Sequence, residues 1–320
     1  MSSAVAVVGN VNADLLVGPV RELPAWGTEH LATMFLVRTG GAAGNTMMAL
    51  ARLGQPCLGV GSVGDDLYGR LILDELRAAG ADTQHIVVVS GSPTGIGVTV
   101  LRDDGERLFL AFLGHLLSFG DGDLERAARL WSGCRAVLLC GWNDLPSMTT
   151  SGIRRFLHRA RQDGLMTLFD TGWDLNDWKT GAREIVRSLL PYVDLFLPNE
   201  PEALAIGGGK DVYEAAQALL QAGAGAVIVK RGPHGSLYVD RSRLVESPAL
   251  KVKAVDTVGA GDAFNAGILY GLVHGLSPQR LLCFANAVGA HVVQRMTDRY
   301  PTEEEVMRTV STCPQWLSAT

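Results

Sequence analysis

Short apolar runs alternate with segments of helical period along most of this chain, and this alternation constrains the fold more than any other feature. The runs lie at residues 5–8, 57–63, 136–140, 166–169, 195–197 and 226–229. They lack polar alternation, so we expect strands that are buried on both faces. Helical segments lie between them, at residues 45–53, 67–79, 123–131, 150–162, 176–190 and 212–222. The pattern predicts a mostly parallel central sheet covered by helices on both faces, a three-layer α/β/α fold.

Other parts of the chain do not follow this alternation of strand and helix segments. Helical segments at 262–273, 278–294 and 302–317 predict an α-helical end to the fold. Two β-rich runs, 95–101 and 107–112, flank an Asp-Gly pair, which is a hairpin signal. We therefore expect a small β-lid formed by about residues 12–40 and 94–113. No Pro- or Ser-rich linker and no repeat divides the sequence, so we interpret residues 1–320 as a single domain.

Composition and charge exclude several classes of protein. The net charge is −5 and no basic block occurs, so we expect no nucleic-acid partner. The apolar runs are far shorter than the roughly 20 residues of a membrane-spanning helix. The five cysteines are odd in number and never form a CxxC pair, which predicts small core residues rather than disulfides or a zinc site. Without a secretory signal after Met1, we expect a cytoplasmic protein.

A Gly-rich turn, DTVGAGDAFNAG at residues 256–267, runs directly into a helical segment. Backbone N–H groups at such a helix start converge on one point, so Gly259, Ala260 and Gly261 are predicted to hold an anion. A carboxylate beside that anion, Asp262, makes sense if it accepts a proton from a hydroxyl that attacks a bound phosphoryl group. The helix N-terminus favours its ionised form, which predicts a weak base near neutral pH. A simple helix cap is the alternative interpretation.

Four further elements precede this turn in a fixed order. They are GNVNAD at 9–14, GGAAGN at 40–45, GSVGDDLYG at 61–69 and NEPE at 199–202. With these elements the chain resembles the PfkB family of carbohydrate and nucleoside kinases, which have the ribokinase-like fold, over almost its whole length. Five sequence elements in the order of the family are a much more specific indication of this resemblance than any single element.

The resemblance implies roles for individual residues. The sugar pocket would be formed by Asn12, Asp14, Gly40, Gly41 and Asn45. Such side chains suit a polyol, because they offer fixed hydrogen-bonding groups while glycines let the backbone approach. Asp262 would be the catalytic base, and the anion hole would be Gly259, Ala260 and Gly261. For Asp14 a solvated turn residue is the alternative.

The resemblance also implies a site for ATP and Mg²⁺. The nucleotide would lie against Asn199, Glu202, Lys230, Gly232, Gly235 and Asn286, with Asn286 near the adenine. Glu202 would organise Mg²⁺ directly or through water, because Mg²⁺ needs few protein oxygens. An exposed lysine at a strand end is the alternative for Lys230.

A monovalent-cation site near Asp256 and Val258 is a further implication of the resemblance. In the family this site is completed by a later loop that often contains glycine, whereas here the loop reads RMTDR at 295–299. This departure leaves potassium activation open. Ala42 and Ala43 stand where some family members carry a lysine, so strict ribose specificity is not implied.

These features predict an ATP-dependent kinase that phosphorylates a hydroxyl, of hydroxymethyl type, on a sugar or nucleoside. A non-catalytic sugar or nucleotide sensor on the same fold is the first alternative. The second is an NAD-dependent oxidoreductase, because residues 59–64 satisfy the GxGxxG pattern after a predicted strand. A P-loop is excluded, since GGGKD at 207–211 has no Ser or Thr after the lysine. We also expect the lid to expose an apolar face that a second copy covers, giving a homodimer.

Overall fold

A central sheet organises the computed structural model, which describes residues 4–103, 106–179 and 181–317. In these residues the sheet has nine strands, which run from one edge to the other in the order β13 (Leu244–Ser247), β12 (Ser236–Asp240), β11 (Ala226–Lys230), β10 (Leu195–Phe196), β9 (Met166–Asp170), β8 (Cys134–Cys140), β1 (Ala4–Gly9), β4 (Cys57–Gly64) and β5 (Ile86–Val89). All neighbours from β11 to β5 are parallel, and β12 and β13 are antiparallel at the edge. The predicted mostly parallel sheet is confirmed.

Strand β1 shows why the predicted strands are apolar throughout. Successive side chains of a strand point to opposite faces of the sheet. Val5 and Val7 pack in one hydrophobic core, and Ala6 and Val8 pack in the core on the opposite face. Each fully buried Val or Leu contributes about 1.5–3 kcal/mol relative to an exposed one.

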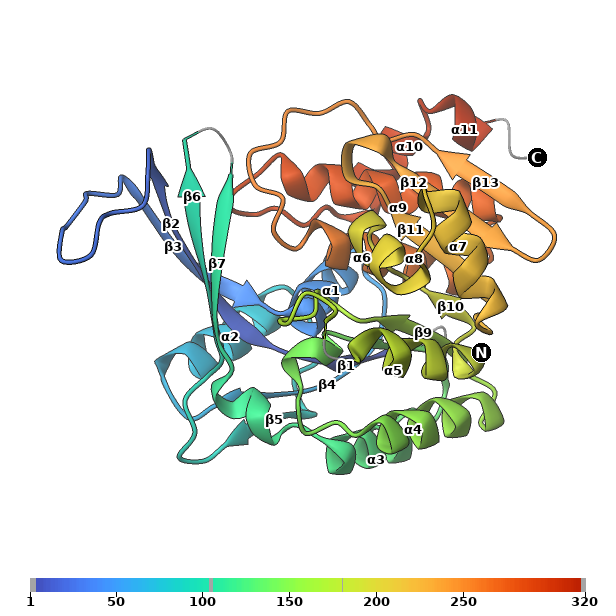
Figure 1. Ribbon diagram of the computed structural model, residues 1–320, viewed down its shortest axis with the longest axis horizontal. Helices are drawn as coiled ribbons and strands as arrows, with labels where there is room; N and C mark the ends of the chain where they lie inside the picture. Colours follow the sequence, from blue (N-terminus) through green and yellow to red (C-terminus); the bar gives the residue numbers. More distant parts are fainter. Residues whose placement is uncertain (1–3, 104–105, 180, 318–320) are drawn as a thin grey trace.

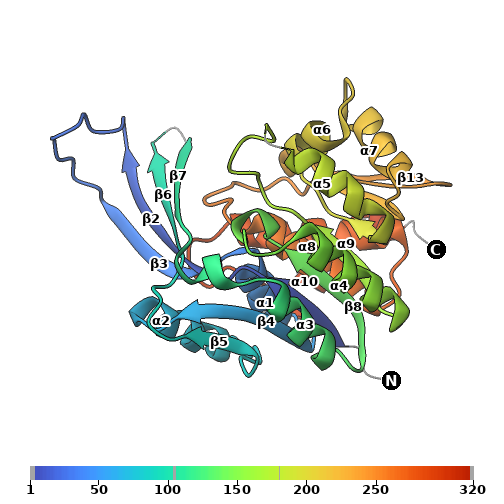
Figure 2. The ribbon, with the colours of Figure 1, turned by 60° about the horizontal axis from the view of Figure 1, so that its bottom comes forward.

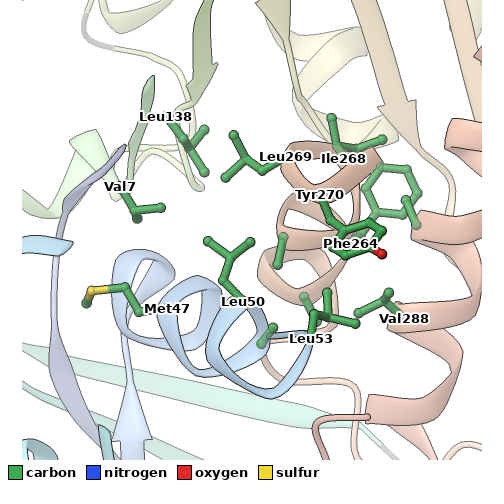
Figure 3. Packing of buried hydrophobic residues seen from close by; sticks show 14 of the residues in the cluster. Val7, Met47, Leu50, Leu53, Leu138, Phe264, Ile268, Leu269, Tyr270 and Val288 are labelled. Carbon is green, nitrogen blue, oxygen red and sulfur yellow. The ribbon is translucent and has the colours of Figure 1, made fainter. Parts of the chain in front are cut away.

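Helices cover both faces of the sheet. The first core is closed by α1 (Ala42–Arg52), α2 (Leu67–Ala78), α8 (Ala260–Val273), α9 (Pro278–Val293) and α10 (Glu303–Val310). The second is closed by α3 (Asp121–Leu130), α4 (Thr150–Gln162), α5 (Ala182–Leu189), α6 (Glu200–Gly207) and α7 (Val212–Gln221). In the first core, Leu50 of α1 and Leu269 of α8 lie beside each other next to Val7 and Leu138 of the sheet (Figure 3). The molecule therefore has the predicted three layers.

The lid is a second sheet that projects from one side of the body (Figures 1 and 2). Its strands, in spatial order, are β3 (Met34–Gly40), β2 (Asn12–Val20), β6 (Ile96–Arg102) and β7 (Arg107–Phe112). Both predicted segments contribute, and β6 and β7 pair antiparallel from Ile96↔Phe112 to Leu101↔Arg107. Residues 104–105, the predicted Asp-Gly turn, lie outside the described residues.

Several local predictions need correction. The predicted helix at 176–190 is only α5, and the predicted helix at 302–317 is divided into α10 and α11 (Pro314–Leu317). The GxGxxG residues 59–64 lie inside strand β4 rather than in a turn that leads into a helix. They therefore cannot form the pyrophosphate-binding turn of a dinucleotide fold.

Two predictions about the loops and cysteines hold. Gly207 ends α6 and Gly208 caps it, so the GGGKD segment is a helix-ending loop. All five cysteines are free thiols, and three of them are buried. Among the helices of the described residues, none has the length and apolar composition needed to cross a bilayer.

Candidate active site

A cleft of about 1080 Å³ lies at the carboxyl edge of the sheet, where Asp170 ends β9 and Lys230 ends β11. Ligands of open α/β sheets bind at this edge. The cleft is lined by many of the residues predicted for the nucleotide and for catalysis, namely Asn199, Glu202, Lys230, Gly232, Gly235, Ala260, Gly261, Asp262 and Asn286. Residues separated by more than 80 positions in the sequence therefore share one cavity.

The N-terminus of α8 opens into this cleft. Gly259 precedes the helix in the left-handed region, at a φ of 76°, which favours glycine. The first bond of the helix runs from the Ala263 N–H to the Gly259 carbonyl, and the Ala260 N–H donates to the Thr257 carbonyl. The N–H groups of Gly261 and Asp262 precede the first helical bond, at the positive end of the helix dipole. This is the geometry of an anion site.

Asp262 lies in the first turn of α8 and is held from outside the helix. The Asn45 amide nitrogen donates to Asp262 Oδ2 at 2.8 Å, and the Tyr300 hydroxyl donates to Asn45 Oδ1 at 2.8 Å. The amide of Asn45, predicted for the sugar pocket, is thus engaged in orienting Asp262. A helix cap would accept a hydrogen bond from a backbone N–H of α8. The contact to Asp262 instead comes from Asn45, outside the helix, so it gives the capping alternative no support.

The expected weak basicity of Asp262 is wrong. Burial, and next the negative charge of Asp170, raise the pKa of Asp262 to about 7. Both effects oppose ionisation and outweigh the hydrogen bond from Asn45 and the charge of Lys230. Asp262 therefore has the proton affinity of a general base that works near neutral pH.

Lys230 forms a buried ion pair at the floor of the cleft. Its Nζ lies 2.6 Å from Asp170 Oδ2, and its side chain is only 13% exposed, which rules out the exposed-lysine alternative. The Asn265 amide, from α8, donates to the same carboxylate oxygen. Burial alone would lower the pKa of Lys230, but the carboxylates of Asp170 and Glu202 raise it above its ordinary value. The lysine is a fixed positive charge beside the anion site.

Sequence reasoning missed Asp170 and Tyr300. Asp170 had a usable signal, because an acidic residue directly after a buried strand of a parallel sheet lies at the ligand-binding edge. Tyr300 had no such signal, since its contact with Asn45 joins residues 255 positions apart.

Asn199 and Glu202 form a reciprocal capping box at the start of α6. Asn199 Oδ1 accepts from the Glu202 N–H, and Glu202 Oε2 accepts from the Asn199 N–H, both at 2.8 Å. Burial, and next the charge of Asp170, raise the pKa of Glu202 to about 7. Among the described residues no group of three or more His, Cys, Asp or Glu could hold a metal by itself. The donor set fits only an ion that takes most of its ligands from phosphate and water, as Mg²⁺ does.

The residues predicted for the sugar lie together at the base of the lid. Strands β2 and β3 place Asn12 opposite Gly40, and the Asn12 amide donates to Asp14 Oδ1 at 3.1 Å. A Cβ on Gly40 would stand 2.1 Å from Asp14 Oδ1, so a side chain at this position would displace the Asp14 carboxylate. Gly41 likewise faces the Asn12 side chain, where a Cβ would stand 2.6 Å from Oδ1.

Asp14 is 8% exposed, so it is not a solvated turn residue. Burial raises its pKa to about 6 in spite of the nearby Arg38. The lid also reaches the nucleotide side, because Arg107 of β7 donates to the Thr257 hydroxyl, which lines the cleft. The lid therefore contacts the turn that precedes α8.

Asp256 does not have the environment predicted for a monovalent-cation ligand. It is fully buried, and its Oδ2 accepts from Arg38 at 2.6 Å and from Arg299 at 2.8 Å. Burial opposes ionisation, but these two guanidinium groups hold the pKa of Asp256 below its ordinary value. The carboxylate is already neutralised by side chains of this chain.

The three-layer body with its β-lid has the ribokinase-like fold. The structure is similar to that of Arabidopsis thaliana ribokinase complexed with ribose and ATP, with a TM-score of 0.82, 26% identity, and coverage of 97% of this chain and 99% of that chain. The chain is 30% identical to probable fructokinase-7 of Arabidopsis thaliana, over 82% of this chain and 80% of the relative. It is 27% identical to the ribokinase of Mus musculus, over 92% and 90% of the two chains. The family described as pfkB family carbohydrate kinase matches residues 2–305, so this chain belongs to the PfkB family.

Proposed function

We propose that this protein is an ATP-dependent kinase that phosphorylates a hydroxymethyl-type alcohol of a sugar or nucleoside. One observation carries the proposal: Asp262, with a pKa of about 7, stands in the first turn of α8 beside the amides of an anion site. A base and an anion hole side by side are what transfer of a phosphoryl group to an alcohol requires.

In this proposal Asp262 takes the proton of the acceptor hydroxyl. The N–H groups of Gly261 and of Asp262 itself stabilise charge on the phosphoryl group in transit, and Lys230 adds a fixed positive charge. Gly259 and Ala260 shape the turn that aims these groups, because the Ala260 N–H already donates to the Thr257 carbonyl. A bound Mg²⁺, held by Glu202 directly or through water, would neutralise charge on the nucleotide phosphates. The acceptor lies against Asn12, Asp14 and the adjoining glycines.

The lid has the role of covering the acceptor and excluding water, which would otherwise hydrolyse ATP. We propose that the chain works as a single domain, 1–320, with the lid as its mobile part. ATP as the donor and five free thiols in the described residues are in keeping with a cytoplasmic enzyme. We further propose that the lid carries a homodimer interface.

Asp262→Asn tests the proposal. The amide cannot accept the proton, so kcat should fall by about 10²–10⁴ while ATP binding is retained. ADP release is measured with ribose-like sugars, ketohexoses, sugar acids and nucleosides, and ATP binding by calorimetry. Asp123→Asn is the matched control, because Asp123 lies in the first turn of another helix, α3, which contributes nothing to the cleft.

Two results would contradict the proposal. An unchanged kcat in Asp262→Asn would remove the general base. A wild-type protein that binds ATP but releases no ADP above background with any acceptor class would favour the sensor alternative.

A further inference from the structure

Arg299 lies in the loop between α9 and α10 and points into the turn that precedes the anion site. Its Nη1 is 2.8 Å from Asp256 Oδ2, and its Nη2 donates to the Val258 carbonyl. The Arg299 side chain is 4% exposed and that of Asp256 is 0% exposed. Arg299 therefore bridges a buried carboxylate and a backbone carbonyl two residues apart.

This bridge fixes the peptide groups on which the anion site depends. Asp256 Oδ1 accepts from the Val258 N–H at 3.0 Å, so the N–H and the carbonyl of Val258 are both held. Gly259 follows immediately and begins the anion site. The direction of the amides from Gly259 to Asp262 is thus set by the Arg299–Asp256 pair.

The same loop also supports the catalytic base. Tyr300, next to Arg299, donates to Asn45, and Asn45 donates to Asp262. A single loop therefore holds the amides through Arg299 and the base through Tyr300.

The oxygens that Arg299 contacts are those that a monovalent cation would use. A carboxylate and a backbone carbonyl are hard oxygen donors, which suit K⁺ or Na⁺. In this chain two guanidinium groups, Arg299 and Arg38, already lie on Asp256, and Arg38 also donates to the Met296 carbonyl at 3.3 Å. The potassium site implied by the family resemblance does not fit these residues. The charge of Asp256 is already balanced by two arginines, and the Val258 carbonyl already accepts a hydrogen bond from Arg299.

We propose that Arg299 is a built-in cation and a positioning residue for the anion site, so that this chain works without a monovalent metal ion. The inference rests on the proposed phosphotransferase function. Its basis is the bridge from Arg299 to Asp256 and Val258, directly before the amides that face the phosphoryl group. A guanidinium is always protonated near neutral pH, so it supplies this charge permanently.

The first test is kinetic. Wild-type kcat should agree within about twofold in KCl, NaCl and tetramethylammonium chloride at equal ionic strength. Arg299→Ala should lower kcat by about 10- to 100-fold with ATP affinity little changed, because the amides act mainly in the transition state. KCl or added guanidinium should restore part of the loss, and Arg299→Lys should lose less. Arg295→Ala is the control, because Arg295 is in the same loop but pairs with Glu305 at a more exposed position.

The second test needs no turnover, so it separates failure of this inference from failure of the proposed function. Thermal unfolding is followed in the same three salts without substrate. The wild-type melting temperature should be the same in all three, whereas Arg299→Ala should be stabilised selectively by KCl. Where Arg299→Ala is too unstable to purify, Arg299→Gln, which keeps more of the side-chain volume, takes its place.

Three results would overturn the inference. The first is activation of the wild type by more than about fivefold, or its selective stabilisation, in KCl. The second is an Arg299 variant with wild-type kcat. The third is an Arg299 variant whose defect responds neither to KCl or guanidinium nor to lysine at this position, which would indicate a packing role alone.

Discussion

At the scale of single residues, Asp262 combines two opposite influences on its charge. The helix N-terminus favours the carboxylate, whereas burial and Asp170 favour the acid and raise the pKa to about 7. The ionised form is therefore half populated near neutral pH and nearly complete above pH 8. A base with this pKa can take a proton from an alcohol and return it to water within one turnover.

This pKa predicts the pH dependence of the reaction. As pH falls through about 7, Asp262 becomes protonated and can no longer accept a proton, so kcat/KM should fall about tenfold per pH unit below pH 6. Initial rates from pH 5 to 9 measure this limb. Glu202 also has a pKa of about 7, so Glu202→Gln is the control: its activity is lower, but the limb should stay in place. A profile that is level down to pH 5 would contradict the prediction.

Single residues also show how much of the candidate site could be predicted from the sequence. The Gly-rich turn and the ordered motifs identified Asp262 and Lys230 because each motif is local in the sequence. The charge state of Asp262 was mispredicted, since it depends on burial in the folded chain and next on Asp170, which is 92 positions away in the sequence. The sequence left the monovalent-cation role of Asp256 open for a similar reason, because its partners Arg38 and Arg299 are 218 and 43 positions away.

At the scale of elements, the start of α8 depends on a backbone conformation that only glycine adopts easily. Gly259 has a φ of 76°, and a Cβ there would stand 3.0 Å from the Asn45 amide nitrogen. Gly275, just beyond the other end of α8, has a similar φ of 70° but nothing within 4 Å of such a Cβ. The two glycines thus share a backbone requirement and differ in their surroundings.

Substitution of these two glycines by alanine separates strain from function. Each variant should lose about 1–2 kcal/mol of unfolding free energy, because the left-handed conformation is costly for alanine. Gly259→Ala should also lose at least about tenfold in kcat, since it displaces Asn45 from Asp262 and tilts the anion-site amides. Gly275→Ala should keep wild-type kcat. Urea unfolding and ADP-release rates measure the two effects, and equal kcat values in both variants would contradict the prediction.

The strands that were predicted correctly from the sequence are those that helices cover on both faces of the central sheet. The parallel strands appear in the sequence as continuous apolar runs because both faces are covered. Strands β12 and β13 were missed, since they form an edge hairpin that includes polar residues and positions that are only partly buried or exposed. Helix α6 was missed because its start was interpreted only as a phosphate-binding motif, although Asn199, Pro201 and Glu202 also form a helix start signal.

At the scale of the whole molecule, the site is assembled from residues between Asn12 and Tyr300. Parallel strands bring their carboxyl ends to one edge of the sheet, and the lid strands β2, β3, β6 and β7 project beside the body (Figure 1). The lid strands carry Asn12, Asp14 and Arg107, and Arg107 contacts Thr257 at the cleft. In the proposed mechanism, opening and closing of the lid would change the acceptor side of the site, whereas the N–H groups on α8 would stay in place.

The lid also leaves an apolar surface that the body does not cover. Side chains of a strand alternate between faces, so Leu110 and Phe112 of β7 lie on the face opposite to Arg107, which contacts Thr257. Leu110 is 59% exposed and Phe112 is 53% exposed. Neighbouring exposed apolar side chains on one face indicate an interaction surface, and a second copy of the lid would cover it by two-fold symmetry.

This arrangement predicts a homodimer held by the lids. Wild-type protein at micromolar concentration should have the mass of two chains in light scattering, and Leu110→Asp with Phe112→Asp should have the mass of one, because two carboxylates cannot be buried unpaired in the interface. Leu244→Asp is the control, since Leu244 is 51% exposed but lies on β13, the edge strand of the central sheet, and it should stay dimeric. The monomeric variant should also show a higher KM for the acceptor, because a lid without its partner closes less often over the sugar pocket. A monomeric wild-type protein, or a double variant that remains a dimer, would contradict the assignment of this face.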